Sequence, residues 1–291
     1  MMIEIKRFPP SKKLLFCFRL CSFFTGMLTT ASKIAREAGG LLREHFGEVQ
    51  LVKQASHHDI KLQIDMDCQR LIAQRILAAF PDHSIIGEEE SHGDPASEYR
   101  WVVDPLDGTV NYTHGIPHCC VSIALQKRAG TAAAEELVSI LEGYENVVGV
   151  VFDPMRNELF SAEKGRGAFL NGRPIRVSSR DQIEESILCV GFSKTEATIE
   201  RGLCYHQILV RRARKLRAMG SAALDLAYVA AGRIEAYLEF KISLWDIAAG
   251  ILLVQEAGGK VELRSIGEGQ YSFETLATNG KLDLKSVTSL L

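Results

Sequence analysis

The chain has 291 residues, and 34 Lys and Arg against 36 Asp and Glu give a formal net charge of −2. This balance argues against binding driven by neutralisation of phosphates, so we expect no nucleic-acid partner. Hydrophobic residues at 46% and charged residues at 24% exclude a disordered or collagen-like chain. The seven cysteines form no repeated CxxC pair, which predicts reduced thiols and a cytoplasmic protein.

Residues 1–28 are predicted to be an N-terminal extension. Basic residues precede a largely apolar run over 14–28, as in a signal peptide, but Arg19 interrupts the run and no A-x-A-like cleavage site follows. The run is too short to cross a bilayer, and we expect no membrane segment. We predict a disordered extension or a translation start at Met27, with an export signal as the alternative.

The next part of the chain, residues 29–170, is predicted to be an α+β half. Apolar residues at helical spacing predict a helix from Thr29 or Thr30 to about Phe46. A second helix opens at Asp65 or Asp67 and stops at Pro81. The predicted strands cover 59–64, 84–87, 101–103, 119–126, 147–152 and 159–162, with a variable-looking insert at 130–145.

A turn-rich segment over 165–172 marks the joint to a second half, residues 171–291. Strands are predicted at 186–191, 214–218, 234–239, 260–263 and 275–278. Helices are predicted between or after them at 196–212, 221–232, 245–257 and 280–290. This alternation indicates a layered α/β fold.

Acidic residues follow two predicted strands. Asp104 and Asp107 flank Pro105 in an acidic turn, and two carboxylates held together need a cation or a shared proton between them. If strands 84–87 and 101–103 are neighbours, Glu88 falls beside Asp104. Asp246 stands near a predicted helix N-terminus, where an acid suits the helix dipole. These hard oxygen ligands suit Mg²⁺ or Mn²⁺ rather than zinc.

Small residues near these acids can hold an anion. The N–H groups of Gly108 and Thr109, at a turn entering a helix, can cradle a phosphate, and Thr109 can orient a water. The segment from Gly220 through Ser221 to Ala222 offers a second helix start for the rest of a substrate. Together these features indicate metal-assisted hydrolysis of a phosphoester.

Three motifs resemble the inositol monophosphatase family, within the superfamily that includes fructose-1,6-bisphosphatase. They are Gly87-Glu88-Glu89, Asp104-Pro-Leu-Asp107-Gly108-Thr109-x-Asn111 and Trp245-Asp246-x-Ala-x-Gly250. The match runs from about Ala31 to Asn279. The resemblance implies an αβαβα five-layer sandwich of the sugar phosphatase type, commonly a homodimer inhibited by Li⁺.

The resemblance also implies roles for individual residues. Glu88, Asp104 and the Leu106 carbonyl would bind a first Mg²⁺, a second would be bound by Asp104, Asp107 and Asp246, and Glu88 would reach a weaker third. Thr109, helped by Asp65, would position the attacking water, and the Gly108 and Thr109 amides would hold the phosphate. Glu239 would bind inositol hydroxyls, and Ala222 would contact the ring through its backbone. Lys53 matches the catalytic-loop lysine of the family only approximately, and Tyr112 replaces a usual Phe.

Some residues have plainer interpretations. Cys119 and Cys120 are expected in the core, and His118 is expected on the surface or in packing, with substrate binding as the alternative. A basic run from Arg211 to Arg217 is interpreted as a solvated helix end, with a subunit contact or an anion-binding role as alternatives.

The sequence therefore predicts a Mg²⁺-dependent phosphomonoesterase acting on myo-inositol 1-phosphate or a similar polyol phosphate. Alternative substrates are 3′-phosphoadenosine 5′-phosphate, histidinol phosphate and fructose 1,6-bisphosphate. A non-catalytic role as a regulatory partner of transcription or RNA machinery is the alternative from a different class.

Overall fold

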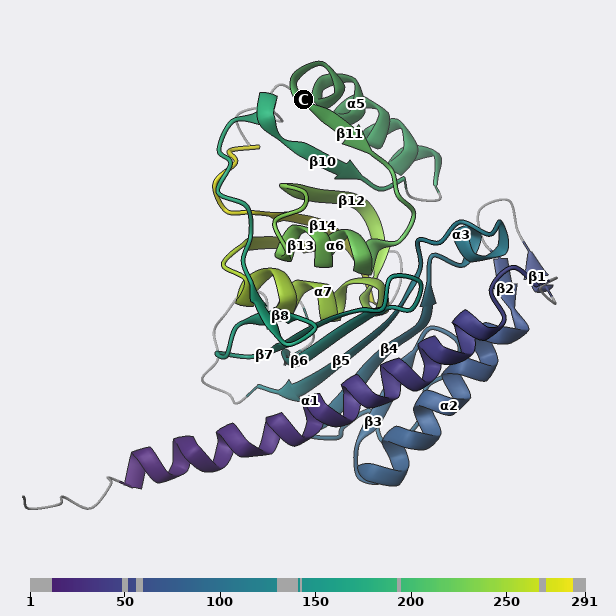
Figure 1. Cartoon of the computed structure of the whole chain (residues 1–291), viewed down its shortest axis with the longest axis vertical. Helices are drawn as coiled ribbons and strands as arrows, with labels where there is room; N and C mark the ends of the chain where they lie inside the picture. Colours follow the sequence, from purple (N-terminus) through teal and green to yellow (C-terminus); the bar gives the residue numbers. More distant parts are fainter. Residues whose placement is uncertain are drawn as a thin grey trace, which may run out of the picture.

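Two large β-sheets alternate with three layers of helix, so the predicted αβαβα sandwich is confirmed (Figure 1). The computed structural model describes residues 12–48, 52–55, 60–129, 141, 143–192, 195–266 and 271–284. None of the helices in these residues is long and apolar enough to cross a membrane.

The larger sheet has seven strands in the order β3-β4-β5-β6-β7-β8-β9. β3 and β4 are parallel, and the other neighbours are antiparallel. The strands are β3 Ser84–Gly87, β4 Tyr99–Asp107, β5 Cys120–Arg128, β6 Tyr144–Asp153, β7 Glu158–Glu163, β8 Ala168–Leu170 and β9 Arg173–Ile175.

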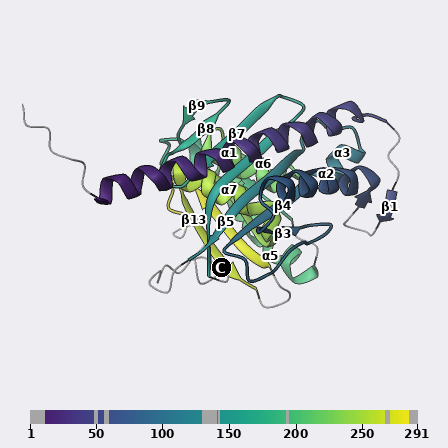
Figure 2. The ribbon, with the colours of Figure 1, turned by 90° about the horizontal axis from the view of Figure 1, so that it is seen from below.

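Helices α1 (Lys12–Glu44) and α2 (Gln63–Ala79) cover one face of the seven-stranded sheet (Figure 2). Their buried apolar residues recur at helical spacing and pack in one cluster with the strands beneath, and Ile34, Ile72 and Ile123 belong to that cluster. The opposite face of the sheet packs against the middle layer of helices.

The middle layer consists of α6 (Ala222–Ala230) and α7 (Leu244–Glu256), which lie between the two sheets (Figure 1). Eight of the nine residues of α6 and nine of the thirteen residues of α7 are buried. A helix that is apolar on all sides needs cover on all sides, and the two sheets provide it. Gly149 of β6 allows α7 to approach the sheet closely, because a Cβ there would lie 2.7 Å from the Ala249 carbonyl oxygen.

The second sheet has five strands in the order β11-β10-β12-β14-β13, and α5 (Glu196–Arg212) covers its outer face. The strands are β10 Ile187–Val190, β11 Lys215–Arg217, β12 Ala236–Ser243, β13 Lys260–Ser265 and β14 Ser272–Thr278. The smaller elements are β1 Val52–Ala55 paired with β2 Ile60–Leu62, helix α3 Thr109–Thr113 and the 3-10 turn η1 Ile183–Glu185.

The expected helix start at Thr29 or Thr30 is wrong, because α1 begins at Lys12. The hydroxyls of Thr29 and Thr30 donate back to the carbonyls of Thr25 and Gly26 inside the helix. Met27 is buried among the same residues as Ile34, so the apolar stripe continues through the segment that was predicted to be disordered. Residues 1–11 lie outside the described part.

The predicted last helix, 280–290, is also wrong over residues 280–284, which are not helical. The Asn279 carboxamide oxygen accepts the N–H groups of Lys281 and Leu282, and these bonds hold a turn instead. Residues 285–290 and most of the predicted insert at 130–145 lie outside the described residues.

Candidate active site

A cavity of about 370 Å³ opens where strand ends meet helix N-termini. β3, β4, β10 and β12 lead into it, and α6 and α7 begin at it. Its lining includes Glu88, Asp104, Leu106, Asp107, Gly108, Thr109, Asn111, Gly191, Phe192, Ser221, Ala222, Asp225, Tyr237, Glu239 and Asp246. The cavity lining therefore contains every predicted site residue except Asp65 and the approximately matched Lys53.

Parallel pairing of β3 with β4 places Glu88 beside Asp104, as predicted. Gly87 lies opposite Val103, and the Glu88 N–H donates to the Val103 carbonyl at 3.1 Å. The strand ends are therefore aligned at one edge of the sheet, and the two acids continue from them into the cavity.

A bulge at the end of β4 turns two acids toward the same space. Asp104 lies opposite Ser122 and Asp107 lies opposite Cys120, so three steps along β4 match two along β5. The Asp104 carboxylate accepts the Leu106 N–H at 2.9 Å, which fixes the turn around Pro105. Asp104 and Asp107 are both buried.

Asp246 reaches the cavity from the first turn of α7. Its carboxylate accepts the Ser243 N–H at 3.0 Å, which caps the helix and orients the side chain. The N-terminal end of the helix dipole favours a negative charge at this position.

Asp104, Asp107 and Asp246 each offer an oxygen, and these three atoms all lie within 4.8 Å of one another. Burial, followed by repulsion from Glu88, raises the pKa of Asp104 and of Asp246 well above the usual range for Asp. Such crowding is unfavourable without a cation, and two buried carboxylates and one half-buried carboxylate at this spacing fit a hard divalent ion. The donor set therefore fits the predicted metal centre.

Asp107 also holds the start of α6. One of its oxygens accepts the Ser221 hydroxyl and the Ala223 N–H, each at 2.7 Å. Burial raises the pKa of Asp107 to about 6, and these two hydrogen bonds oppose that rise. Ser221 was predicted to contact substrate, and its observed contact is with this acid.

Gly108 and Asn111 shape the turn after β4. Gly108 has φ 94°, and a Cβ there would lie 2.9 Å from the His118 carbonyl oxygen, so only glycine fits. The Asn111 amide donates to the carbonyls of His118 at 2.9 Å and Met219 at 2.8 Å. Asn111 therefore joins the loop from the first half to the loop that carries Ser221.

Thr109 donates its hydroxyl to the Leu106 carbonyl at 3.0 Å. Asp65 is buried in the first turn of α2, where its carboxylate accepts the Leu62 N–H at 2.7 Å, and it is absent from the described cavity lining. Lys53 lies exposed on β1, also outside that lining. The roles given to Thr109 and Asp65 in positioning water remain predictions.

His118, expected on the surface or in packing, is buried against the Tyr228 ring, and it faces a second buried polar group, Asp225, that the sequence did not single out. His118 Nε2 and Asp225 Oδ1 lie 3.8 Å apart, and neither atom has a hydrogen-bond partner within the described part of the chain. Asp225 also accepts the Cys189 thiol at 2.9 Å. The sequence gives one sign of this pair of buried groups. Asp225 stands at the fourth position of α6, which is otherwise apolar.

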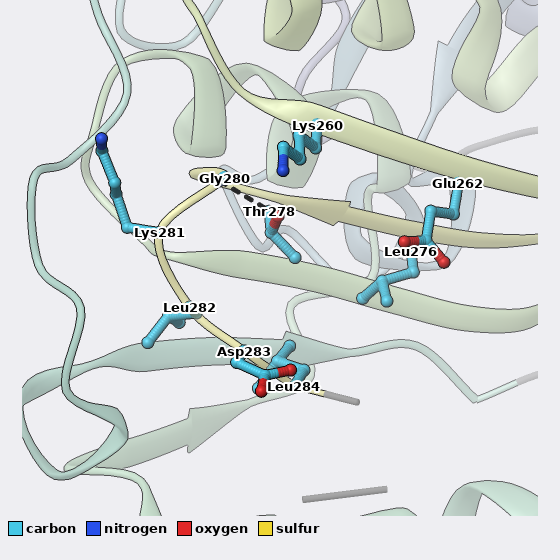
Figure 3. Close-up of a pocket in the computed structure, with 9 residues that line it drawn as sticks. All are labelled: Lys260, Glu262, Leu276, Thr278, Gly280, Lys281, Leu282, Asp283 and Leu284. Carbon is cyan, nitrogen blue, oxygen red and sulfur yellow. Dashed lines mark hydrogen bonds between the residues drawn. The ribbon is translucent and has the colours of Figure 1, made fainter. Parts of the chain in front are cut away.

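A second cavity, of about 330 Å³, lies along β13 and β14 (Figure 3). Lys260, Glu262 and Asp283 line it together with apolar side chains, and the Gly280 N–H donates to the Thr278 hydroxyl at 3.1 Å. Among the described residues, the one group of three acids close enough to share a metal ion lies in the first cavity.

The fold and the carboxylate cluster define a sugar-phosphatase-like protein with a candidate metal centre. The sequence profile of the inositol monophosphatase family matches residues 25–134 and 137–282, and the chain belongs to this family.

Known relatives agree with this assignment. The chain is 43% identical over 238 residues to the Nus factor SuhB of Xylella fastidiosa, covering 79% of this chain and 78% of the relative. It is 39% identical over 230 residues to the fructose-1,6-bisphosphatase/inositol-1-monophosphatase of Thermotoga maritima, covering 79% and 81%. The SuhB structure from Bartonella henselae has a TM-score of 0.77 at 34% identity, covering 88% of this chain and 95% of that one.

Proposed function

We propose that the chain is a Mg²⁺-dependent phosphomonoesterase that hydrolyses myo-inositol 1-phosphate or a similar polyol phosphate. The observation that carries this proposal is the convergence of Asp104, Asp107 and Asp246 within 4.8 Å in one cavity. Family membership supports the reaction class, and the carboxylate donors support Mg²⁺, with Mn²⁺ as a substitute.

Glu88, the Leu106 carbonyl and the three aspartates would hold divalent ions, which would supply the positive charge that water activation and departure of the alcohol oxygen require. Thr109, with Asp65, orients the water for attack on phosphorus in line with the ester oxygen. The Gly108 and Thr109 N–H groups hold the phosphate oxygens. Ala222 and Glu239 contact the alcohol. A new bond forms from the water oxygen to phosphorus while the ester P–O bond breaks and the alcohol leaves with a proton.

Phosphate release from a panel of substrates tests the proposal. The panel contains myo-inositol 1-phosphate, fructose 1,6-bisphosphate, histidinol phosphate and 3′-phosphoadenosine 5′-phosphate, each with Mg²⁺ and with a chelator. We expect turnover with Mg²⁺ only and the highest kcat/KM for a polyol phosphate. Asp104→Asn abolishes turnover, whereas the exposed Asp82→Asn serves as a matched control that retains it. Full turnover in the presence of chelator contradicts the proposal.

A second candidate function is a non-catalytic binding role, which is favoured by the name Nus factor SuhB of the 43% identical relative. An Asp104→Asn protein separates the two, because it loses hydrolysis and keeps any role that depends on its surface. Complementation of a deletion strain by this variant supports the binding role, and failure to complement supports the enzymatic one.

We also propose that the protein is a cytoplasmic homodimer inhibited by Li⁺, as the family resemblance implies. Light scattering after size exclusion gives the oligomeric mass, and phosphate release at increasing LiCl, with KCl as control, gives the inhibition.

A further inference from the structure

One part of the cavity wall comes from the adjacent ends of β10 and β12. The two strands are parallel, with Val190 opposite Leu238, and the Gly191 N–H donates to the Leu238 carbonyl at 2.8 Å. Glu239 is the next residue of β12. Gly191 and Glu239 therefore lie side by side, and both line the cavity.

Tyr237 holds the carboxylate of Glu239 in place. The two residues are separated by one position on β12, so their side chains leave the strand on the same face. The Tyr237 hydroxyl donates to Glu239 Oε2 at 2.5 Å, and both residues are buried. Burial, together with the nearby Glu239 charge, raises the pKa of Tyr237 well above its usual range, so the phenol keeps its proton and remains a donor.

Gly191 supplies the space that this carboxylate occupies. A Cβ at Gly191 would lie 2.0 Å from Glu239 Oε2 and 2.5 Å from its Cδ, closer than real Cβ contacts come. The backbone of Gly191 and the hydroxyl of Tyr237 thus confine the Glu239 carboxylate from two directions.

We infer that Tyr237 and Gly191 are positioning residues that hold Glu239 as a fixed acceptor for a hydroxyl of the alcohol part of the substrate. This inference rests on the proposed function and deepens it. It explains how the chain would favour phosphate esters with a further free hydroxyl, the class that the family resemblance already implies. An aryl phosphate lacks that hydroxyl and cannot make this hydrogen bond, so it gains less from the fixed carboxylate.

Phe192 adds an apolar part to the same wall. Its side chain is 42% exposed although it is a large hydrophobic residue, and it lines the cavity next to Gly191. A ring that presents C–H groups to Phe192 and a hydroxyl to Glu239 fits this wall better than a linear, fully polar ester does.

Steady-state kinetics on two substrates test the inference. We compare myo-inositol 1-phosphate with p-nitrophenyl phosphate, both with Mg²⁺, for wild type, Tyr237→Phe and Gly191→Ala. Tyr237→Phe removes only the hydroxyl, and we expect the ratio of kcat/KM for the polyol ester to that for the aryl ester to fall about tenfold, mainly through KM. Gly191→Ala displaces the carboxylate and lowers the ratio at least as much.

Tyr205→Phe is the matched control. Tyr205 packs against Phe240 on the outer side of the five-stranded sheet, so this variant leaves the ratio unchanged. Circular dichroism and Tm identify any variant that fails to fold. An unchanged ratio in folded Tyr237→Phe, or an equal loss on both substrates, overturns the inference and leaves the proposed function standing. A wild type that hydrolyses neither ester overturns both.

Discussion

Ser221 donates its hydroxyl to the carboxylate of Asp107 at 2.7 Å, and this bond joins α6 to the end of β4. The same oxygen accepts the Ala223 N–H. One acid thus belongs to the candidate metal cluster and also caps a buried helix from the other half of the chain. Metal binding and the packing of α6 are therefore coupled through Asp107.

Replacing Ser221 with Ala is expected to weaken metal binding. The variant removes a hydrogen bond that lowers the pKa of Asp107, so at pH 6–7 more of this acid is protonated and the Mg²⁺ concentration for half-maximal activity rises several-fold. Unfolding free energy falls by about 1–2 kcal/mol. Mg²⁺ titration of phosphate release and urea unfolding measure the two effects. Ser221→Thr keeps a hydroxyl and restores Mg²⁺ affinity; equal affinity in Ser221→Ala and wild type contradicts the coupling.

Asp104→Asn is expected to stabilise the metal-free protein while it abolishes metal binding. Glu88, Asp107 and Asp246 all repel the Asp104 charge, and removal of that charge relieves the repulsion. Thermal scans with chelator should give a higher Tm for the variant than for wild type, and added Mg²⁺ should raise only the wild-type Tm. A lower Tm for the variant in chelator would show that repulsion among these acids does not dominate the stability of the metal-free protein.

Metal-free protein is expected to lose stability as pH rises. The pKa of Asp107 is about 6 in the fold against 3.8 for the free group, so between these values the folded chain binds more protons than the unfolded chain. Stability is therefore highest at the acidic side of this window and falls as pH rises through about 6, by on the order of 3 kcal/mol from this group. Urea unfolding in chelator at pH 4 and pH 7, with a Mg²⁺ series as control, measures most of this change. A rise in metal-free stability over that interval would contradict the assignment.

Asn111→Ala is expected to reduce both stability and activity. It leaves the carbonyls of His118 and Met219 without their shared donor and frees the loop before Ser221. The cost is about 1–3 kcal/mol of unfolding free energy, with an increase in KM. Asn111→Asp cannot donate and should be at least as harmful, so a stable, fully active Asp variant would exclude this role.

Adjacent glycines in α1 are expected to respond in opposite ways. At Gly39 a Cβ would lie 2.5 Å from the Phe152 ring, whereas at Gly40 no atom lies within 4 Å. Gly40→Ala gains helix propensity and stabilises by about 0.5–1 kcal/mol, and Gly39→Ala forces the buried ring to move and destabilises. Chemical unfolding of the two variants compares them directly. Destabilisation of both variants by the same amount would show that the packing of Phe152 does not decide the outcome.

The motif residues and the layered fold could be predicted from the sequence because each signal is local. Glu88 was expected beside Asp104 if strands 84–87 and 101–103 are neighbours, and the parallel pairing of β3 with β4 meets that condition. The expected burial of Cys119 and Cys120 is also confirmed, since both are fully buried in β5 or beside it.

Pairings between distant segments could not be predicted. Nothing near Asp107 in the sequence indicates Ala223 as its partner, and nothing near Tyr237 indicates that Gly191 leaves room for Glu239. The start of α1 was missed for another reason. Two threonines resemble a helix cap, but burial of Met27 against the sheet extends the helix past them, so tertiary packing overrides the local signal.

The position of α7 between the sheets has a consequence for how the protein tolerates change. Its first turn carries Asp246, and its buried body packs against both sheets. A substitution deep in that body, far from any solvent, shifts the carboxylate along with the helix axis. Substitutions that impair catalysis should therefore occur along the whole of α7. A screen for lost turnover is expected to recover its buried packing residues as well as residues that line the cavity.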